Sequence, residues 1–288
     1  MKLTAITIIF IALLFMPLHA QNEFSHQIPD ARAIGYGGSA VTMTNNPAII
    51  FWNPGGLAFT INDKAMVNMS AQSLFNYIAL TKFLPPSNSF GFSLSRLKCP
   101  SDFLDVATVA YGRRVNPFMA FGANLNYGKL NYSPDDFVTA SFGMLFRPAV
   151  NRYSFYQSGN SILDLFVNPA LYNRFALGVM IHNVPIHNSK VDHEIRFGAN
   201  FKFSEWGPTL NFGQHFHRGK NSTHLGIGFN LSRNFYFFSG ITDFDINLLA
   251  MGGSIRYQKI NLDVGYSPIT EKVSFAFSLQ LSDDPDVL

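Results

Sequence analysis

The chain has 288 residues. Aromatic residues, including 30 Phe, make up 15% of them, and charged residues only 14%. Bulky aromatic side chains at the expense of charge suit a surface that faces lipid. The formal net charge is +3 and the 21 Lys and Arg residues are scattered, so no basic stripe for phosphates is present and nucleic acid is not expected as a partner.

The first twenty residues have the features of an export signal. Lys2 gives a positive start, residues 3–16 are apolar apart from two Thr, and Ala20 is a small residue suited to cleavage before Gln21. The alternative is a membrane anchor that is never cut. After cleavage the chain would keep one cysteine, Cys99, so that neither an internal disulfide nor a lipid-modified N-terminus is expected.

Residues 21–61 are rich in glycine and show no alternation of apolar and polar residues. No segment after them approaches the roughly 18 to 20 uninterrupted apolar residues that a membrane helix needs. If the protein lies in a membrane, it must do so as a closed sheet, because lipid cannot satisfy open strand edges.

From Lys64 onward, apolar residues alternate with small or polar ones in short stretches that are separated by turn residues. In the last stretch, Phe275, Phe277 and Leu279 fall on one face, with Ser, Ala and Gln between them. A soluble sandwich would carry charge on its second face. Here that face is small and weakly polar, which favours a barrel whose lumen is filled or watery.

Fourteen such stretches are predicted, and an even number returns both ends of the chain to the periplasmic side of a bacterial barrel. They are 64–71, 74–83, 89–97, 104–113, 118–132, 136–147, 174–183, 192–203, 207–218, 222–232, 234–242, 247–257, 259–267 and 272–281. Because 74–83 and 234–242 are apolar on both faces, twelve strands remain an alternative. Residues 148–173 fit no strand, and we expect a long connection with a short helix at 161–166.

Fourteen strands spaced ~4.8 Å apart and tilted ~40° give a backbone diameter of about 28 Å, which Gly and Ser side chains cannot fill. The sequence therefore predicts an all-β, antiparallel transmembrane β-barrel over residues 62–282, with residues 21–61 folded into the lumen as a plug. The signal peptide (1–20) precedes the plug, and a short tail (283–288) follows the barrel.

The plug segment contains a motif of glycine, proline, asparagine and one tryptophan. Proline removes a backbone donor and fixes φ, and glycine permits close backbone approach, so the segment is suited to tight turns in a confined lumen. Trp52 adds bulk and one N–H that needs a partner when buried. For Trp52-Asn53-Pro54, a structural role is favoured over a role in ligand contact. Trp52 is expected either to anchor the plug or to be part of a turn that leads into the first strand. The motif residues, structural or gating, are Arg32, Gly35, Gly37, Gly38, Asn46, Pro47, Trp52, Asn53, Pro54, Gly55 and Leu57.

This motif resembles the opening of the PorV/PorQ group of outer-membrane proteins, which belongs with the superfamily of the long-chain fatty-acid transporter FadL. In that group Ala-Arg-x-x-Gly-x-Gly-Gly precedes Trp-Asn-Pro-Ala-Gly-Leu, and this chain departs from the pattern by having Gly55 in place of the Ala. Weaker similarities follow in the expected order at 175–184 and 194–198. The resemblance implies a fourteen-stranded barrel with an inward-folded plug, the architecture that the strand count also predicts.

The resemblance implies an outer-membrane accessory of type IX protein secretion, whose partners are outer-membrane lipid and secreted proteins or components of the secretion machinery. The first alternative is a FadL-like channel that passes a hydrophobic ligand through a plug-gated lumen. The second is a purely structural outer-membrane protein. Short strands and the lack of long external loops leave little room for a hydrophobic capture site, which favours the secretion role.

Three histidines are expected to form a polar patch in the lumen. His215 and His217 share the polar face of their strand, and a two-residue turn at Gly219-Lys220 would place His215 across from His224. Three imidazoles suit a transition metal or a response to pH, but polar lining near the barrel rim is the preferred interpretation. We expect that the protein binds no metal or cofactor and is not an enzyme, since the sequence has no nucleophile motif, phosphate loop or dinucleotide fingerprint.

Overall fold

The computed structural model describes residues 30–70, 73–98, 103–130, 136–147, 174–187, 193–204, 207–217, 220–268 and 272–282. Four predicted segments fall outside these residues: the signal peptide, the first part of the plug at 21–29, the helix at 161–166 and the tail at 283–288. Cys99 also lies outside them.

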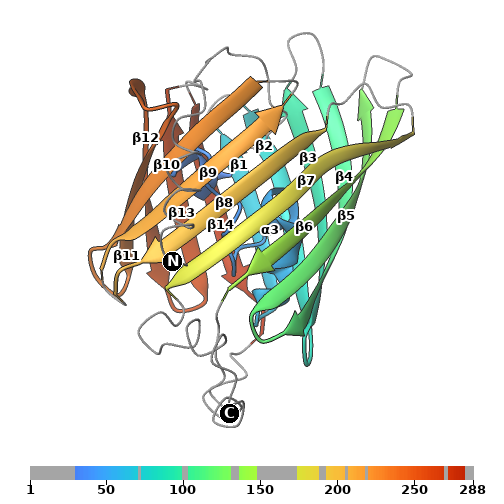
Figure 1. Cartoon of the computed structure of the whole chain (residues 1–288), viewed down its shortest axis with the longest axis horizontal. Coiled ribbons are helices and arrows are strands. Elements are labelled where there is room, and N and C mark those ends of the chain that lie inside the picture. Colours follow the sequence, from blue (N-terminus) through green and yellow to red (C-terminus); the bar gives the residue numbers. More distant parts are fainter. Residues whose placement is uncertain are drawn as a thin grey trace, which may run out of the picture.

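In the described part of the chain, fourteen antiparallel strands form one closed barrel, in which β1 pairs with both β2 and β14 (Figure 1). Fourteen is therefore confirmed, and the alternative of twelve is wrong, because both stretches in doubt are strands that pair on each side. The strands are β1 (Lys64–Ser70), β2 (Ser73–Leu84), β3 (Asn88–Lys98), β4 (Phe103–Asn116), β5 (Met119–Leu130), β6 (Asp136–Phe146), β7 (Phe175–His187), β8 (Glu194–Lys202), β9 (Thr209–His217), β10 (Lys220–Asn230), β11 (Phe235–Thr242), β12 (Asp245–Tyr257), β13 (Ile260–Ser267) and β14 (Lys272–Gln280).

The outer face of the barrel is apolar, as the alternation predicts. In β14, Phe275 and Phe277 are 40% and 43% exposed, whereas Ser274 and Ala276 are fully buried on the inner face. The same division holds along β3, β5 and β13, where large apolar side chains alternate with buried small ones. Such a surface is stable in the hydrocarbon region of a bilayer, where every strand edge is already paired. None of the described helices has the length and apolar character that a membrane crossing requires.

The two ends of the barrel are named here by the ends of β1. Lys64, where β1 begins, pairs with Gln280, where β14 ends, so both ends of the strand ladder lie at the Lys64 end. Ser70, which pairs with Ser274, lies toward the other end, the Ser70 end.

Residues 30–62, which we call the inner segment, contain three short helices: α2 (Ala31–Gly35), α3 (Ile49–Trp52) and the 3-10 helix η1 (Pro54–Phe59). Helix α2 packs on β12 and β13, and η1 packs on β4 and β5 across the barrel. Figure 1 shows this segment, in blue, between the near and far walls of the barrel. The largest cluster of buried apolar residues joins the inner segment to inward-facing residues of the wall, so the core of the molecule lies in the lumen.

Candidate functional site

Glycines on the inner face of the barrel make room for the inner segment. Each of the strands β3 to β11, and also β13, has a glycine at which an added Cβ would lie within 3.3 Å of an atom of the inner segment, closer than an ordinary van der Waals contact. We call these ten residues the glycine belt: Gly91, Gly112, Gly122, Gly143, Gly178, Gly198, Gly213, Gly226, Gly240 and Gly265. Glycine within a strand weakens it but permits the close approach of another backbone.

The inner segment follows this belt around the wall. Ala31 lies at Gly265 of β13, and Tyr36 lies at Gly240 of β11. Further along the chain, Val41 reaches β7 and β8, and Pro54 reaches β4 and β5. The segment is thus seated on most of the circumference of the barrel and is not a loose tail.

Asn53 ties the inner segment to the wall. Its side chain is fully buried, and its amide nitrogen donates to the carbonyl oxygens of Val41 and of Met144 in β6, each at 3.0 Å. Its side-chain oxygen accepts the backbone N–H of Gly55 at 3.1 Å and so caps η1. From the wall, Asn124 of β5 donates to the carbonyl of Ile50 at 2.7 Å. Buried amide groups that are fully paired in this way hold one backbone arrangement.

Trp52 is buried at the end of α3, with η1 between it and β1, so it is not a turn that leads into the first strand. The guanidinium of Arg196 lies over its ring at 5.1 Å from the centroid, and the ring of His215 lies 6.4 Å away. The expectation that its N–H finds a partner is wrong within the described residues, where the Nε1 atom has no acceptor. Among the described residues, Trp52 is therefore held by the cation–π contact and by packing, and not by a hydrogen bond of its N–H.

Arg32 fixes α2 by an ion pair with Asp263 of β13, 2.8 Å from Nη2 to Oδ1, and by a hydrogen bond to Ser254 at 3.3 Å. Asp30 caps the same helix by accepting the N–H of Ala33 at 3.0 Å, and it accepts the hydroxyl of Tyr77 at 2.9 Å. Burial, together with the negative charge of Asp263, raises the pKa of Asp30 to about 6. The carboxyl group of Asp30 is thus poised to change charge within the ordinary range of pH.

Gly37 and Gly38 turn the chain after α2 with φ values of +64° and +90°, which side-chain-bearing residues rarely adopt. The turn presents the carbonyl oxygen of Gly37 to the wall, where the Nδ1 atom of His224 and the hydroxyl of Thr242 contact it. Gly35 lies against the ring of Phe238, which an added Cβ would overlap.

The remaining motif residues shape the second half of the inner segment. The side-chain oxygen of Asn46 accepts the N–H of Ala48 at 2.9 Å, and Pro47 is buried just before α3. Gly55 lies so close to the backbone of Gly143 that an added Cβ would be 2.9 Å from its carbonyl oxygen, and Leu57 is fully buried. The structure therefore brings all the motif residues into one inner segment, although in contact with different strands.

The predicted register of the histidines is wrong by two residues. His215 pairs with Ser222, and His224 pairs with Gly213, because the turn between β9 and β10 falls one residue earlier than predicted. A shift of two preserves the face, so both side chains still point inward, with ring centroids 4.2 Å apart. His217 lies across from Glu194 of β8 and is half-buried.

The histidine patch lies near the ends of β9 and β10 that are joined to each other, and it also forms part of the seat of the inner segment. His224 contacts the carbonyl oxygen of Gly37, and the Nδ1 atom of His215 lies 3.3 Å from Glu194, which also pairs with Arg196 at 2.6 Å. Among the described residues, no group of three or more His, Cys, Asp or Glu side chains is arranged to hold a metal ion.

The sequence interpretation missed Glu194, Arg196, Asp263 and Asn124 as contacts of the inner segment or of its anchors. Each occupies an inward position of its strand, so the alternation alone marked it as lumenal. Which of them touch the inner segment depends on pairs far apart in the sequence.

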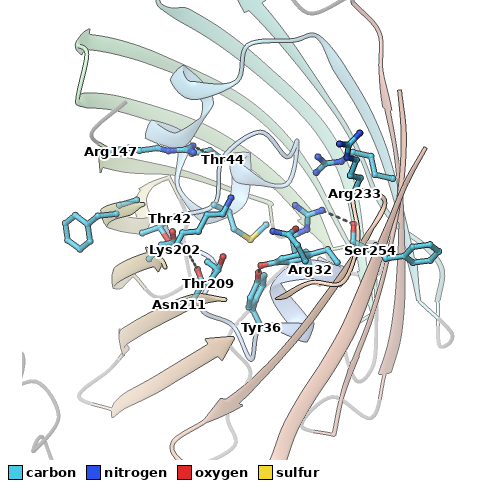
Figure 2. Close-up of a pocket in the computed structure, with 18 of the residues that line it drawn as sticks. Arg32, Tyr36, Thr42, Thr44, Arg147, Lys202, Thr209, Asn211, Arg233 and Ser254 are labelled. Carbon is cyan, nitrogen blue, oxygen red and sulfur yellow. Dashed lines mark hydrogen bonds between the residues drawn. The ribbon is translucent and has the colours of Figure 1, made fainter. Parts of the chain in front are cut away.

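A cavity of about 330 Å³ lies between the inner segment and the wall at the Lys64 end (Figure 2). The inner segment lines it with Arg32, Tyr36 and residues 42–44. The wall contributes the ends of β8 and β12, the start of β9, Arg147 after β6, and the turn between β10 and β11.

Comparisons with known proteins place the fold. No protein-family model matches the sequence, and no curated protein matches it. The toluene transporter TodX of Pseudomonas putida is similar in structure, with a TM-score of 0.56 and 11% identity over 85% of this chain and 96% of TodX. The monoaromatic hydrocarbon channel CymD has a TM-score of 0.59 and 10% identity over 91% of this chain and all of that chain. The fold is that of an outer-membrane β-barrel. At such identities the likeness concerns the fold alone, and the PorV/PorQ resemblance rests on the motif residues.

Proposed function

We propose that this chain is an outer-membrane channel of FadL-like type for hydrophobic small molecules, in which the inner segment is the plug that closes the lumen. The observation that carries the proposal is the seating of the inner segment on the glycine belt, since ten strands each omit a side chain where this segment passes. The named transport roles of TodX and CymD support a transport role for the shared fold.

A channel of this kind has to release the plug in order to open. An engineered disulfide between the inner segment and the wall would prevent that release until it is reduced. A Cβ added at Gly213 would lie 3.5 Å from the Cβ of Ser39, at the short end of the range of roughly 3.5–4.5 Å found in disulfides. The variant S39C/G213C, with Cys99→Ser to remove the native thiol, should therefore join the inner segment to β9 when oxidised.

The test is the accumulation of toluene by bacterial cells that carry this variant in their outer membrane. Uptake should be slow after oxidation and should recover after reduction, while the single variants S39C and G213C should be indifferent to the redox state. Uptake that is the same in the oxidised and reduced double variant would contradict a plug-gated channel.

A second candidate is the accessory role in type IX protein secretion, and one observation favours it. The connections between strands at the Ser70 end are two to six residues long, which leaves little room for an external capture site. Here the barrel would be a membrane anchor for secreted proteins or for secretion components. Capture of such proteins from native membranes, with toluene uptake unaffected by the disulfide, would support this role instead.

Both roles need export to the outer membrane, with the Lys64 end toward the periplasm as expected for an even-stranded bacterial barrel. We propose that residues 1–20 direct this export and are then removed. N-terminal sequencing of the mature protein should begin at Gln21, and a chain that begins at Met1 would contradict cleavage.

A further inference from the structure

The cavity at the Lys64 end is strongly cationic. Among the described residues that line it, five are Arg or Lys and none is acidic: Arg32, Arg147, Lys202, Arg233 and Arg256. We propose that this cavity binds a small phosphorylated molecule that carries hydroxyl groups, and that the bound molecule bridges the inner segment to the barrel wall. This goes beyond the proposed channel, which requires no anion.

The five cations come from separate elements and converge on one space. Figure 2 shows Arg147 and Lys202 reaching the cavity from one side, and Arg32 and Arg233 from the opposite side. Asp263 pairs with Arg32, and Arg147 donates to the neutral hydroxyl of Thr44. The described lining therefore carries an excess of positive charge, with Arg233 and Arg256 exposed to solvent, and a bound anion would lower the repulsion between these cations.

Arg147 follows β6 and lines the cavity beside Thr44, where burial and, to a smaller extent, the charge of Arg114 outside the cavity lower its pKa. A phosphate monoester carries about two negative charges at neutral pH and three acceptor oxygens, which suits several converging Arg and Lys side chains better than a single carboxylate does.

Most of the rest of the lining is polar, and its apolar residues are Met43, Phe175, Ala176 and Phe235. Side chains of Thr, Asn, Ser and Tyr surround the cations, among them Thr42, Thr209, Asn230 and Tyr236. Asn200 donates to Asn211 at 2.7 Å, which orients two amide groups at the edge of the cavity. The cavity volume of about 330 Å³ falls at the small end of the range of roughly 300–1,000 Å³ for small-molecule sites.

The location identifies the ligand as soluble and not as a lipid headgroup. Lys202, Asn211 and Arg256 occupy the same inward-facing positions as the glycine belt and the buried residues of their strands, and the outer face of those strands is apolar. Because the lining comes from both the inner segment and the wall, a bound phosphate ester would contact the two at once and hold the segment in its seat.

The test is calorimetric binding to the purified full-length protein in detergent, which does not depend on transport. The probes are glucose 6-phosphate and glucose, chosen because they differ only in the phosphate. Glucose 6-phosphate should bind, glucose should not, and the binding should weaken as the salt concentration rises.

The variants Arg147→Gln and Lys202→Gln should each reduce the affinity for glucose 6-phosphate at least tenfold. The matched control is Arg96→Gln, which removes one positive charge at an exposed ion pair with Asp105 in β3 and β4, outside the cavity. A gel-mobility shift on boiling, retained in all three variants, shows that each barrel is folded. Absence of binding, equal binding of glucose, or equal affinity in the cavity variants and the control would each overturn the proposal.

Discussion

Gly122→Ala perturbs the seat of the inner segment at a backbone contact. An added Cβ would lie 2.3 Å from both the carbonyl carbon and the carbonyl oxygen of Pro54. These are backbone atoms and cannot rotate away, so the segment must shift by about 1 Å to restore an ordinary contact. The strand ladder of β5 is separate from this contact, and both of its pairings stay intact.

Overpacking of this kind costs roughly 1–3 kcal/mol, and each 1.4 kcal/mol is a factor of ten in an equilibrium. We therefore expect the fraction of time that the inner segment is released to rise by roughly 5- to 150-fold. Single-channel recording in planar bilayers measures this fraction as open probability.

The matched control is Gly253→Ala in β12, where the nearest atom to an added Cβ is the carbonyl oxygen of Tyr236 at 3.7 Å. This variant should record like the wild type. If Gly122→Ala also records like the wild type, or if both variants open equally, then the glycine belt does not govern the position of the inner segment.

Three further changes test individual anchors. Trp52→Ala should remove about 3–5 kcal/mol of packing and raise the conductance while the gel-mobility shift of the barrel persists, and unchanged conductance would show that Trp52 is not an anchor. Docking raises the pKa of Asp30 above its ordinary value, to about 6, so protonation of Asp30 favours the docked segment. This stabilisation of the docked segment is complete when the pH is below the ordinary pKa of Asp, and it is lost as the pH rises through about 6. Open probability should therefore fall roughly tenfold from pH 7.5 to pH 5, and Asp30→Asn should abolish that dependence, whereas an unaltered pH profile in the variant would refute the assignment. Replacing His215, His217 and His224 together by Asn should leave the barrel folded and its metal content unchanged. It should lower the free energy of docking of the inner segment by only about 1 kcal/mol, through the lost contact with Gly37. A bound metal in the wild type that the variant lacks would count against this.

The strands and their faces could be predicted from the sequence because both follow from a period of two. The stretches at 74–83 and 234–242 were ambiguous, since an apolar residue on the inner face looks the same whether it faces a core or lipid. In the structure Tyr77 and Phe238, on those inner faces, are fully buried against the inner segment. The filled lumen therefore explains why these two strands are apolar on both sides.

The contacts of the inner segment could not be predicted, because they depend on how distant strands line up. The register of the histidines is one example: an error of one residue in the position of a turn shifts every cross-strand pair by two residues, which keeps the face of the sheet and changes the partner. The glycine belt is a second example of contacts that the sequence does not reveal. Gly122 and Gly265 each look like a weak point in a strand, and only the closed barrel reveals that they lie along the path of one segment.

The central claim is that residues of the N-terminal segment occupy and close the lumen. Conductance in planar bilayers of the wild type and of a variant lacking residues 21–60 tests it most directly. The wild type should be nearly closed, and the deletion variant should conduct steadily, since Gly and Ser side chains cannot fill a barrel with a backbone diameter of about 28 Å. Equal conductance of the two proteins would contradict the claim.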